Sequence, residues 1–320
     1  MARAGVDALA DRLRQGERAA LARAITLIES GKAAHRAEAS QLLERVMPAT
    51  GGALRLGITG VPGAGKSTLI DALGAHLIDQ GERVAVLAVD PSSTRTGGAI
   101  LADKTRMSRL AAAPEAFIRP SPSGGSLGGV AARTREALLC VEAAGFTVVI
   151  VETVGVGQSE TTVADMVDTF LALMIPGAGD ELQGIKKGLL ERADIIAVNK
   201  ADGRQKDAAH HAAADLMSAV KILAAEQTPA VLTVSALDGT GLSGLWEAVV
   251  SHRDGLAASG ALGKRRQQQG VLWMRDMVAD GLGRYLKTHA GAQLAALEAA
   301  VASGERAPSA AAADVLALLP

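Results

Sequence analysis

Residues 54–77 read LRLGITGVPGAGKSTLIDALGAHL, and residues 60–67 of this stretch match the phosphate-binding loop pattern G-x-x-x-x-G-K-[ST] in full. The apolar run at 54–59 predicts a short strand, and the apolar spacing over 67–77 predicts a helix. Between a strand and a helix, the glycines let successive backbone N–H groups turn toward a polyphosphate. The stretch therefore predicts a loop that binds a nucleoside triphosphate.

Two side chains of this loop carry chemistry. Lys66 is placed to reach the β- and γ-phosphates, and the Ser67 hydroxyl is placed to hold a Mg²⁺ ion. The residues expected to contact the nucleotide here are Gly60, Val61, Pro62, Gly63, Ala64, Gly65, Lys66, Ser67 and Thr68.

The composition is that of an ordinary globular protein, because 48% of the 320 residues are apolar and 21% are charged. A formal net charge of −1 argues against a general nucleic-acid or membrane binder. No apolar run approaches the roughly 18–20 residues of a spanning helix, and no signal-peptide or transit-peptide pattern is recognised. The one cysteine, Cys140, is expected to be a buried structural thiol and fits a reducing compartment. We therefore expect a cytoplasmic protein.

Beyond residue 54, apolar strands alternate with helices, which predicts an α/β fold with a mostly parallel sheet covered on both faces. Strands are predicted at 54–59, 84–89, 117–119, 147–151, 170–175, 195–198 and 230–234. Helices are predicted at 67–80, 104–113, 130–144, 181–192, 208–224 and 242–253. Ligands of such sheets bind at the carboxyl ends of the strands.

Helical segments flank this region on both sides. Residues 7–50 have helical spacing, with one amphipathic segment before Gly31 and a second after it. After Lys264 no strand is predicted, and apolar residues suggest helices over 272–286 and 294–301. The predicted domains are an N-terminal helical extension at 1–52, a P-loop domain at 53–258 and a C-terminal helical arm at 259–320.

The C-terminal arm has an apolar stripe and no sheet of its own. Two arrangements account for it equally well: the arm packs on a second copy of the chain, giving a homodimer, or it packs back on its own domain. The basic run Lys264-Arg-Arg266 at the start of the arm is interpreted as a solvated helix surface.

A second nucleotide motif, Asn199-Lys200-Ala201-Asp202, follows an apolar strand about 130 residues after the loop. N-K-x-D reads guanine, since the Asp202 carboxylate can accept hydrogen bonds from both guanine N1–H and N2–H₂, whereas adenine offers no such pair of donors. Asn199 is expected to brace the loop, and the Lys200 stem to lie over the base. The strand-end residues Ser235, Ala236 and Leu237 complete the predicted guanine site. GTP is therefore favoured over ATP.

Acidic residues follow two further strands. Glu152 stands where many GTPases have the Asp of D-x-x-G, and Gly155 supplies the glycine that contacts the γ-phosphate. Asp90 closes the second strand and Asp103 follows it across a Ser- and Gly-rich segment. We expect Ser67, Asp90, Asp103 and Glu152 near the metal, and Lys66 with the same three acids to be catalytic.

The residue after Gly155 is Val156, where many small GTPases place the glutamine that orients the attacking water. Gln158 or a residue of a partner is left to replace it. The sequence therefore predicts slow intrinsic hydrolysis that a partner accelerates.

Together these motifs resemble the MeaB/ArgK family, to which the methylmalonic aciduria type A protein belongs, within the SIMIBI class of P-loop GTPases. The resemblance is carried by GITGVPGAGKST, VAVLAVDPSSTRTGGAILADKTRM, FIRPSP, VETVGVGQSE, PGAGDELQGIKKG and NKAD, and it covers nearly the whole chain. It implies a homodimeric GTPase that uses GTP, GDP and Mg²⁺, gates the loading of adenosylcobalamin onto methylmalonyl-CoA mutase and protects that enzyme. It also implies nucleotide-sensing switches at 91–106, 153–160 and 177–188.

Two other functions share the phosphate-binding loop. A P-loop kinase would need an acceptor pocket, and the N-K-x-D motif argues against it. A metallochaperone GTPase would need a Cys/His cluster, whereas this chain has one cysteine and the pair His210-His211 in a polar helix. Both alternatives are kept beside the mutase-chaperone hypothesis.

Overall fold

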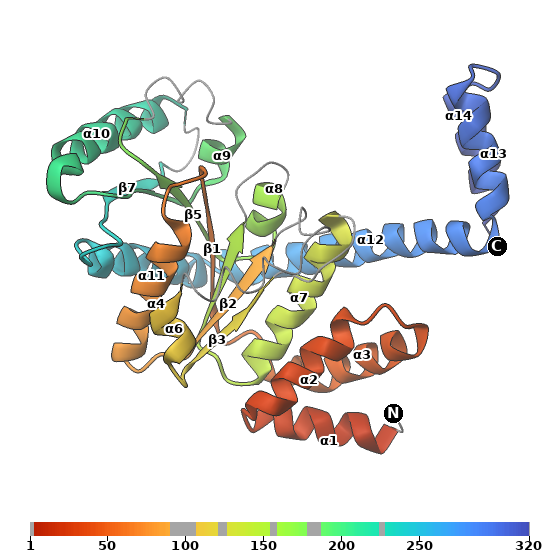
Figure 1. Cartoon of the computed structure of the whole chain (residues 1–320), viewed down its shortest axis with the longest axis horizontal. Coiled ribbons are helices and arrows are strands. Elements are labelled where there is room, and N and C mark those ends of the chain that lie inside the picture. The colour runs from red at the N-terminus through yellow and green to blue at the C-terminus, as the bar shows by residue number, and fades with distance from the viewer. Residues whose placement is uncertain are drawn as a thin grey trace. The chain divides into compact units, whose positions relative to one another are not determined.

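The computed structural model describes residues 3–89, 107–120, 127–153, 159–177, 187–223 and 228–319. All seven predicted strands are confirmed (Figure 1). They are β1 (Leu54–Gly60), β2 (Val84–Val89), β3 (Ala116–Arg119), β4 (Val148–Thr153), β5 (Thr169–Met174), β6 (Ile195–Val198) and β7 (Ala230–Thr233).

Helices precede, connect and follow these strands. In chain order they are α1 (Arg3–Arg14), α2 (Arg18–Glu29), α3 (Ala33–Val46), η1 (Met47–Ala49), α4 (Lys66–Asp79), α6 (Ser108–Ala112), α7 (Leu127–Ala143), α8 (Ser159–Ala164), α9 (Lys187–Arg192), η2 (Gly203–Gln205), α10 (Lys206–Leu223), α11 (Leu242–Ala258), α12 (Ala261–His289), α13 (Gly291–Ala302) and α14 (Pro308–Leu316).

Three features differ from the prediction. The first amphipathic segment is two helices, because Gly16 takes a left-handed φ of 77° between α1 and α2. Strand β4 continues two residues past the predicted end, since Thr153 pairs with Val89 of β2 and Glu152 pairs with Ile58 of β1. The short helix α8 and the final helix α14 were not predicted.

The sheet order is β3-β2-β4-β1-β5-β6-β7, and every neighbouring pair is parallel. Strand β1 lies between β4 and β5 and is buried along its whole length. Its carboxyl end, where the phosphate-binding loop starts, therefore lies in the middle of the edge at which ligands of parallel sheets bind.

Each face of the sheet is covered by its own apolar layer. Alternation along the strands sends Leu56 and Ile58 of β1 into one layer, together with the apolar sides of α4, α6 and α11. On the other face, Val149 and Val151 of β4 join the layer made with α1, α2, α3, α7, α8, α9 and α10. This double coverage explains why the strands read as nearly continuous apolar runs.

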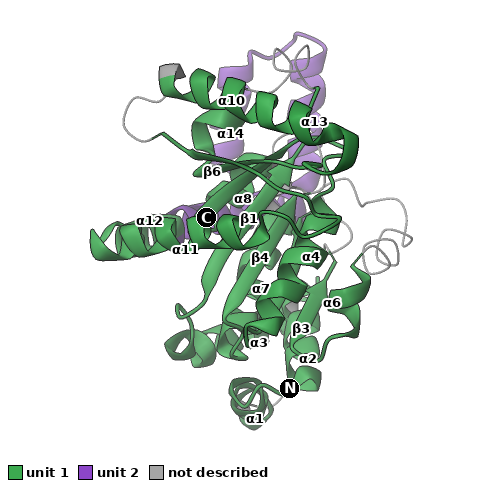
Figure 2. Cartoon of the chain, turned by 90° about the vertical axis from the view of Figure 1, so that its left-hand side faces the viewer, with its two compact units in different colours: residues 1–269 green, residues 270–320 purple. Residues whose placement is uncertain are grey.

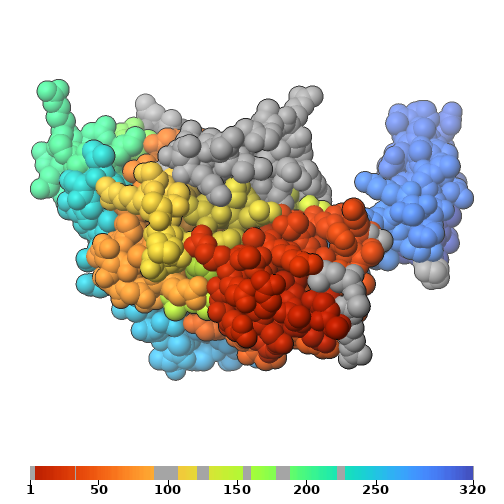
Figure 3. Space-filling view, turned by 60° about the horizontal axis from the view of Figure 1, so that its bottom comes forward, coloured from red at the N-terminus to blue at the C-terminus, as the bar shows by residue number. Residues whose placement is uncertain are grey.

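The N-terminal helices pack on the sheet domain and form one continuous surface with it in Figure 3, where they are red. Arg18 of α2 donates from Nη1 to the carbonyls of Pro114 (2.6 Å) and Ala116 (2.8 Å). At the far end of α2, Glu29 is paired with Arg119, which ends β3. Both ends of α2 are therefore tied to the β3 strand.

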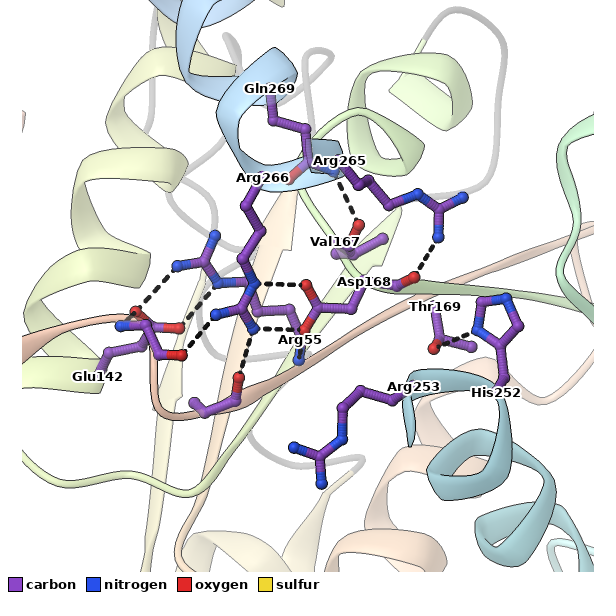
Figure 4. Close-up of polar contacts among 12 residues, drawn as sticks. Arg55, Glu142, Val167, Asp168, Thr169, His252, Arg253, Arg265, Arg266 and Gln269 are labelled. Atoms are coloured by element: carbon purple, nitrogen blue, oxygen red, sulfur yellow. Dashed lines mark hydrogen bonds and ion pairs between the residues drawn. The ribbon is translucent and has the colours of Figure 1, made fainter. Parts of the chain in front are cut away.

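A group of charged residues at the amino ends of β1 and β5 holds the start of α12 (Figure 4). Asp194, which precedes β6, contributes to the same group. Arg266 grips the fully buried Asp168 through Nε (2.8 Å) and Nη2 (2.7 Å). Arg265 pairs with Asp194 at 3.2 Å. The interpretation of Lys264-Arg-Arg266 as a solvated surface is therefore wrong for two of its three residues, because long guanidinium side chains reach back over the sheet edge.

Contacts divide the chain into two units, residues 1–269 and 270–320 (Figure 2). The boundary between the two units falls inside α12. The three domains expected from the sequence (1–52, 53–258 and 259–320) stay a prediction. Within the described residues, no helix combines the length and the apolar character that crossing a membrane requires.

Candidate nucleotide-binding site

The phosphate-binding loop joins β1 to α4 and depends on two glycines. A Cβ at Gly60 would lie 2.3 Å from the carbonyl oxygen of Leu173, so no other residue fits there. Gly65 precedes α4 with a left-handed φ of 86°, and a Cβ there would lie 2.7 Å from Nδ2 of Asn199. The backbone therefore passes close to Leu173 of β5 and to Asn199, and a side chain at either glycine would collide with them.

Lys66, the first residue of α4, folds its ammonium over the loop. Its Nζ donates to the carbonyls of Gly60 (2.8 Å) and Val61 (3.3 Å). Burial lowers the pKa of the Lys66 ammonium, and the negative charges of Glu152 and Glu160 oppose that shift. The Lys66 ammonium is therefore bonded to the loop backbone and interacts electrostatically with two carboxylates.

Ser67 and Glu152 bring two oxygen ligands together. The Ser67 hydroxyl donates to Oε1 of Glu152 at 3.0 Å, and Glu152 is only 4% exposed on β4. Directly beneath the loop, the buried hydroxyl of Thr153 donates to that of Thr59 at 2.9 Å. Hydroxyl and carboxylate oxygens are the donors that Mg²⁺ prefers, so the chemistry of this pair fits that ion.

The other acids predicted around the metal lie outside the described residues. These are Asp90 and Asp103, and the same holds for Gly155, Val156 and Gln158. Within the described ranges, no group of three His, Cys, Asp or Glu side chains forms a metal cluster. Of the four residues predicted near the metal, the structure therefore places Ser67 and Glu152 in contact and leaves the roles of all four as predictions.

Asn199 joins three segments with one amide. The side chain is 2% exposed, and Nδ2 donates to the carbonyl of Ala64 in the phosphate-binding loop at 2.7 Å. Its Oδ1 accepts the backbone N–H of Ala236 at 3.0 Å. The end of β6 is therefore bonded both to the loop after β1 and to the loop after β7.

The two residues expected to recognise the base follow Asn199. Lys200 has a φ of 61°, the only positive value for a non-glycine residue in the described chain, and is partly buried. Oδ2 of Asp202 accepts a hydrogen bond from the buried hydroxyl of Ser235 at 2.7 Å. The Ser235 oxygen in turn accepts the N–H of Asp238 at 3.2 Å. These bonds fix the orientation of the Asp202 carboxylate.

All the described predicted residues thus gather at the carboxyl ends of β1, β4, β6 and β7. Pro62, Gly63 and Thr68 are exposed, and Leu237 is 75% exposed. Sequence reasoning missed the Thr59–Thr153 pair beneath the loop. The sequence does show a threonine at the end of each of two apolar strands, and this pattern could have suggested the pair.

Known proteins match this chain over the whole nucleotide site. Residues 21–290 match the family model "Methylmalonyl Co-A mutase-associated GTPase MeaB". The GTPase ArgK of Escherichia coli is 55% identical over 86% of this chain and 84% of its own, and the mitochondrial methylmalonic aciduria type A homolog of Mus musculus is 42% identical over 96% and 78%. A crystal structure titled LAO/AO transport system kinase is 43% identical, with a TM-score of 0.77, and the match covers 98% of this chain and 97% of that one.

Proposed function

Because the chain belongs to the MeaB family of methylmalonyl-CoA mutase-associated GTPases, we propose that it is a GTP-dependent chaperone of methylmalonyl-CoA mutase. In this role it gates the loading of adenosylcobalamin onto the mutase and protects the mutase from inactivation. The observation that carries the proposal is the family match over 21–290, which includes every described nucleotide motif. The protein itself is a GTPase that binds GTP and GDP.

The nucleotide is held at two separate points. The amides of the loop and the Lys66 ammonium bind the phosphates, and the Asp202 carboxylate accepts from N1–H and N2–H₂ of guanine. Asn199 supports this division of labour because its amide bonds the loop to the segment that contains Ala236. The segment that binds the phosphates and the segment that binds the base are therefore connected to each other through Asn199.

Mg²⁺ is held by the Ser67 hydroxyl and Glu152, together with Asp90 and Asp103. The 3.0 Å hydrogen bond from Ser67 Oγ to Glu152 Oε1 supports the first two ligands, since it brings two oxygens of the kind that Mg²⁺ prefers next to each other. When bound, the ion neutralises charge that develops on the β- and γ-phosphates. Only GTP offers a γ-phosphate to the protein, so GTP and GDP make different contacts and favour different conformations. The mutase binds these conformations with different affinity.

Hydrolysis by the isolated protein is slow and is accelerated by the partner. Val156 occupies the place of the water-orienting glutamine, and an aliphatic side chain cannot position an attacking water by hydrogen bonds. The residue that orients the attacking water instead is Gln158 or a residue of the mutase.

The protein is a cytoplasmic homodimer that pairs through the C-terminal arm. Support for pairing comes from α12, on which Val271, Leu272, Met274, Met277, Val278 and Leu282 are between 43% and 57% exposed. A row of large apolar side chains of this kind marks a protein-binding surface. Support for the location comes from Cys140, which is buried and whose thiol pKa burial raises to about 12, as expected of an inert thiol in a reducing compartment.

A binding experiment tests the chaperone role. Purified methylmalonyl-CoA mutase is titrated with the protein in the presence of GDP or of a non-hydrolysable GTP analogue, and the dissociation constants are compared. We expect the two constants to differ by at least tenfold in the wild type. In the Lys66→Ala variant, which loses its grip on phosphate, the constants should become equal. No binding of the mutase in either nucleotide state would contradict the proposal.

A further inference from the structure

Two buried threonines, Thr59 and Thr153, are hydrogen-bonded where the pairing of two central strands ends. The register of β1 with β4 ends at Ile58 and Glu152, one residue before each threonine. Past that point, Thr59 pairs with β5 on the other side of β1, and Thr153 pairs with β2 on the other side of β4. The Thr153 hydroxyl donates to the Thr59 hydroxyl at 2.9 Å. This bond therefore connects β1 to β4 beyond the last residues that the backbone pairs.

The two hydroxyl groups lie in an apolar layer. Because side chains alternate along a strand, Thr153 shares a face with Val151, and Thr59 shares a face with Gly57. Val151 belongs to the layer that α7 and α8 cover, and a Cβ at Gly57 would lie 2.9 Å from Phe170 of the same layer. Both threonines are fully buried. A buried hydroxyl is costly unless it is hydrogen-bonded, and valine would fill the same space without that cost. The bond, and not packing, therefore accounts for threonine at both positions.

Each threonine is the covalent neighbour of a residue of the nucleotide site. Thr59 directly precedes Gly60, the first glycine of the phosphate-binding loop. Thr153 directly follows Glu152, whose side chain lies on the opposite face of β4 and accepts a hydrogen bond from Ser67 of α4 at 3.0 Å. Glu152 is thus bonded to α4 on one face of the sheet, while its neighbour is bonded to β1 on the other face. The hydroxyl bond therefore restrains the backbone of Glu152 relative to the start of the loop.

From this arrangement we infer that Thr59 and Thr153 are positioning residues for GTP hydrolysis, and that they act through the Glu152 carboxylate. The inference rests on the proposed role of Glu152 and Ser67 as ligands of Mg²⁺. Without the hydroxyl bond, the ends of β1 and β4 are free to move apart, so the two ligand oxygens are held together less closely. Binding of GDP without the metal depends on the loop and on Asp202, and it does not need this restraint.

The test uses the full-length double variant Thr59→Val/Thr153→Val. Removing both partners leaves neither buried hydroxyl unpaired, so the urea midpoint of unfolding should stay close to that of the wild type. Single-turnover GTP hydrolysis with Mg²⁺ should be about tenfold slower. The factor by which Mg²⁺ strengthens binding of a non-hydrolysable GTP analogue should fall about fivefold, whereas the dissociation constant for GDP without Mg²⁺ should stay within about twofold of the wild type.

Three further variants separate the bond from the side chains that make it. Thr153→Ser keeps the donating hydroxyl and should recover most of the rate. Thr153→Val alone removes the same bond and should lose as much of the rate as the double variant. The matched control is Thr169→Val, which removes another fully buried threonine hydroxyl, one that bonds His252 at the amino end of β5. The control should change neither the hydrolysis rate nor the Mg²⁺ factor.

Three outcomes would overturn the inference. The first is a wild-type hydrolysis rate in the double variant, and the second is a slower rate with an unchanged Mg²⁺ factor. The third is an equal loss of hydrolysis and of metal-free GDP affinity together with a lower urea midpoint, because that result describes general damage to the sheet. If the double variant does not fold, the same measurements on Thr153→Val decide. Should Mg²⁺ fail to strengthen binding of the analogue by the wild type, the proposed metal role of Glu152 is contradicted, and the inference falls with it.

Discussion

Asn199 shows how much of this site depends on single polar groups. A buried side-chain amide must have its donors and acceptor satisfied. Here Nδ2 donates to the carbonyl of Ala64 and Oδ1 accepts the N–H of Ala236, so one side chain bonds a backbone group in each of two loops. The sequence predicted that Asn199 would brace a loop, but the partners on either side depend on the order of β1, β6 and β7 in the sheet.

Asp202→Asn is expected to change base preference more than phosphate binding. The asparagine amide presents a donor where guanine also presents donors, so GTP affinity should fall by about 10- to 100-fold, corresponding to roughly 1–3 kcal/mol. Xanthosine triphosphate has a carbonyl at C2 and should gain affinity. Calorimetric titration with GTP, xanthosine triphosphate and ATP measures all three.

Lys66→Ala is the matched control for that experiment, since it should weaken every triphosphate alike. If Asp202→Asn bound GTP as tightly as the wild type, guanine recognition by Asp202 would have to be abandoned. The kinase alternative would regain support if the wild type preferred ATP.

Glu136 predicts a pH dependence of stability. Burial raises the pKa of its carboxyl in α7 to about 7 from 4.5, and the positive charge of Arg133 opposes the rise. Between these values the unfolded chain is ionised while the folded chain keeps its proton, so the free energy of unfolding falls as pH rises. The loss approaches about 2–3 kcal/mol over the window, with the full value an upper limit.

Urea unfolding of the wild type and of Glu136→Gln from about pH 4.5 to about pH 7.5 measures this dependence. The glutamine variant should lose this pH-dependent contribution. Glu115→Gln, which changes an exposed carboxylate, should follow the wild type at every pH. Parallel curves for wild type and Glu136→Gln would show that Glu136 is not buried in its neutral form.

Among the elements, the first turns of α12 are attached by ion pairs and not by an apolar face. Arg55 pairs with Glu142 through both its Nε (2.8 Å) and Nη2 (2.9 Å), and both side chains are at most 9% exposed. Beside them Arg266 contacts Asp168 and also donates from Nη2 to the carbonyl of Ala53 at 2.8 Å. Strand β1 starts at this cluster and ends at the phosphate-binding loop. A single strand therefore connects the first turns of α12 to the nucleotide site.

Arg266→Ala is expected to destabilise the protein by about 3–5 kcal/mol, because it leaves the charge of the fully buried Asp168 with less compensation. Chemical denaturation measures the change. Lys264→Ala, two residues earlier and exposed, should change the free energy of unfolding by less than about 0.5 kcal/mol. Equal effects of the two substitutions would mean that the observed ion pair does not hold α12.

At the scale of the whole molecule, the exposed stripe of α12 predicts self-association. Leu282→Asp places a charge in the proposed dimer interface and should raise the dimer dissociation constant at least about 100-fold, because an unpaired charge would be desolvated. Sedimentation equilibrium measures this constant. Lys287→Asp adds a negative charge at an exposed position about 140° around the same helix and should leave association intact. A monomeric wild type at micromolar concentration would contradict the homodimer.

Several features of the fold were readable in advance because their causes are local. The strand before Gly60, the turn that needs Gly65 and the helix from Lys66 all follow from residues within a few positions of one another. Apolar runs likewise identified all seven strands, since burial on both faces of a parallel sheet leaves a continuous signal. The family resemblance was readable for the same reason, because it is carried by contiguous motifs.

Contacts between distant residues could not be read from the chain. Asp71 looks like any polar residue of an amphipathic helix until Leu110 of α6 is placed beside it, and Arg266 looks like part of a solvated basic run until Asp168 lies beneath it. Local spacing determines which segments become strands and helices and which loop binds phosphate. Which buried charge meets which partner depends on how the strands are ordered in the sheet. That order is decided by packing between segments that lie 39 residues apart in the first case and 98 in the second, and no periodic pattern in the sequence reports it.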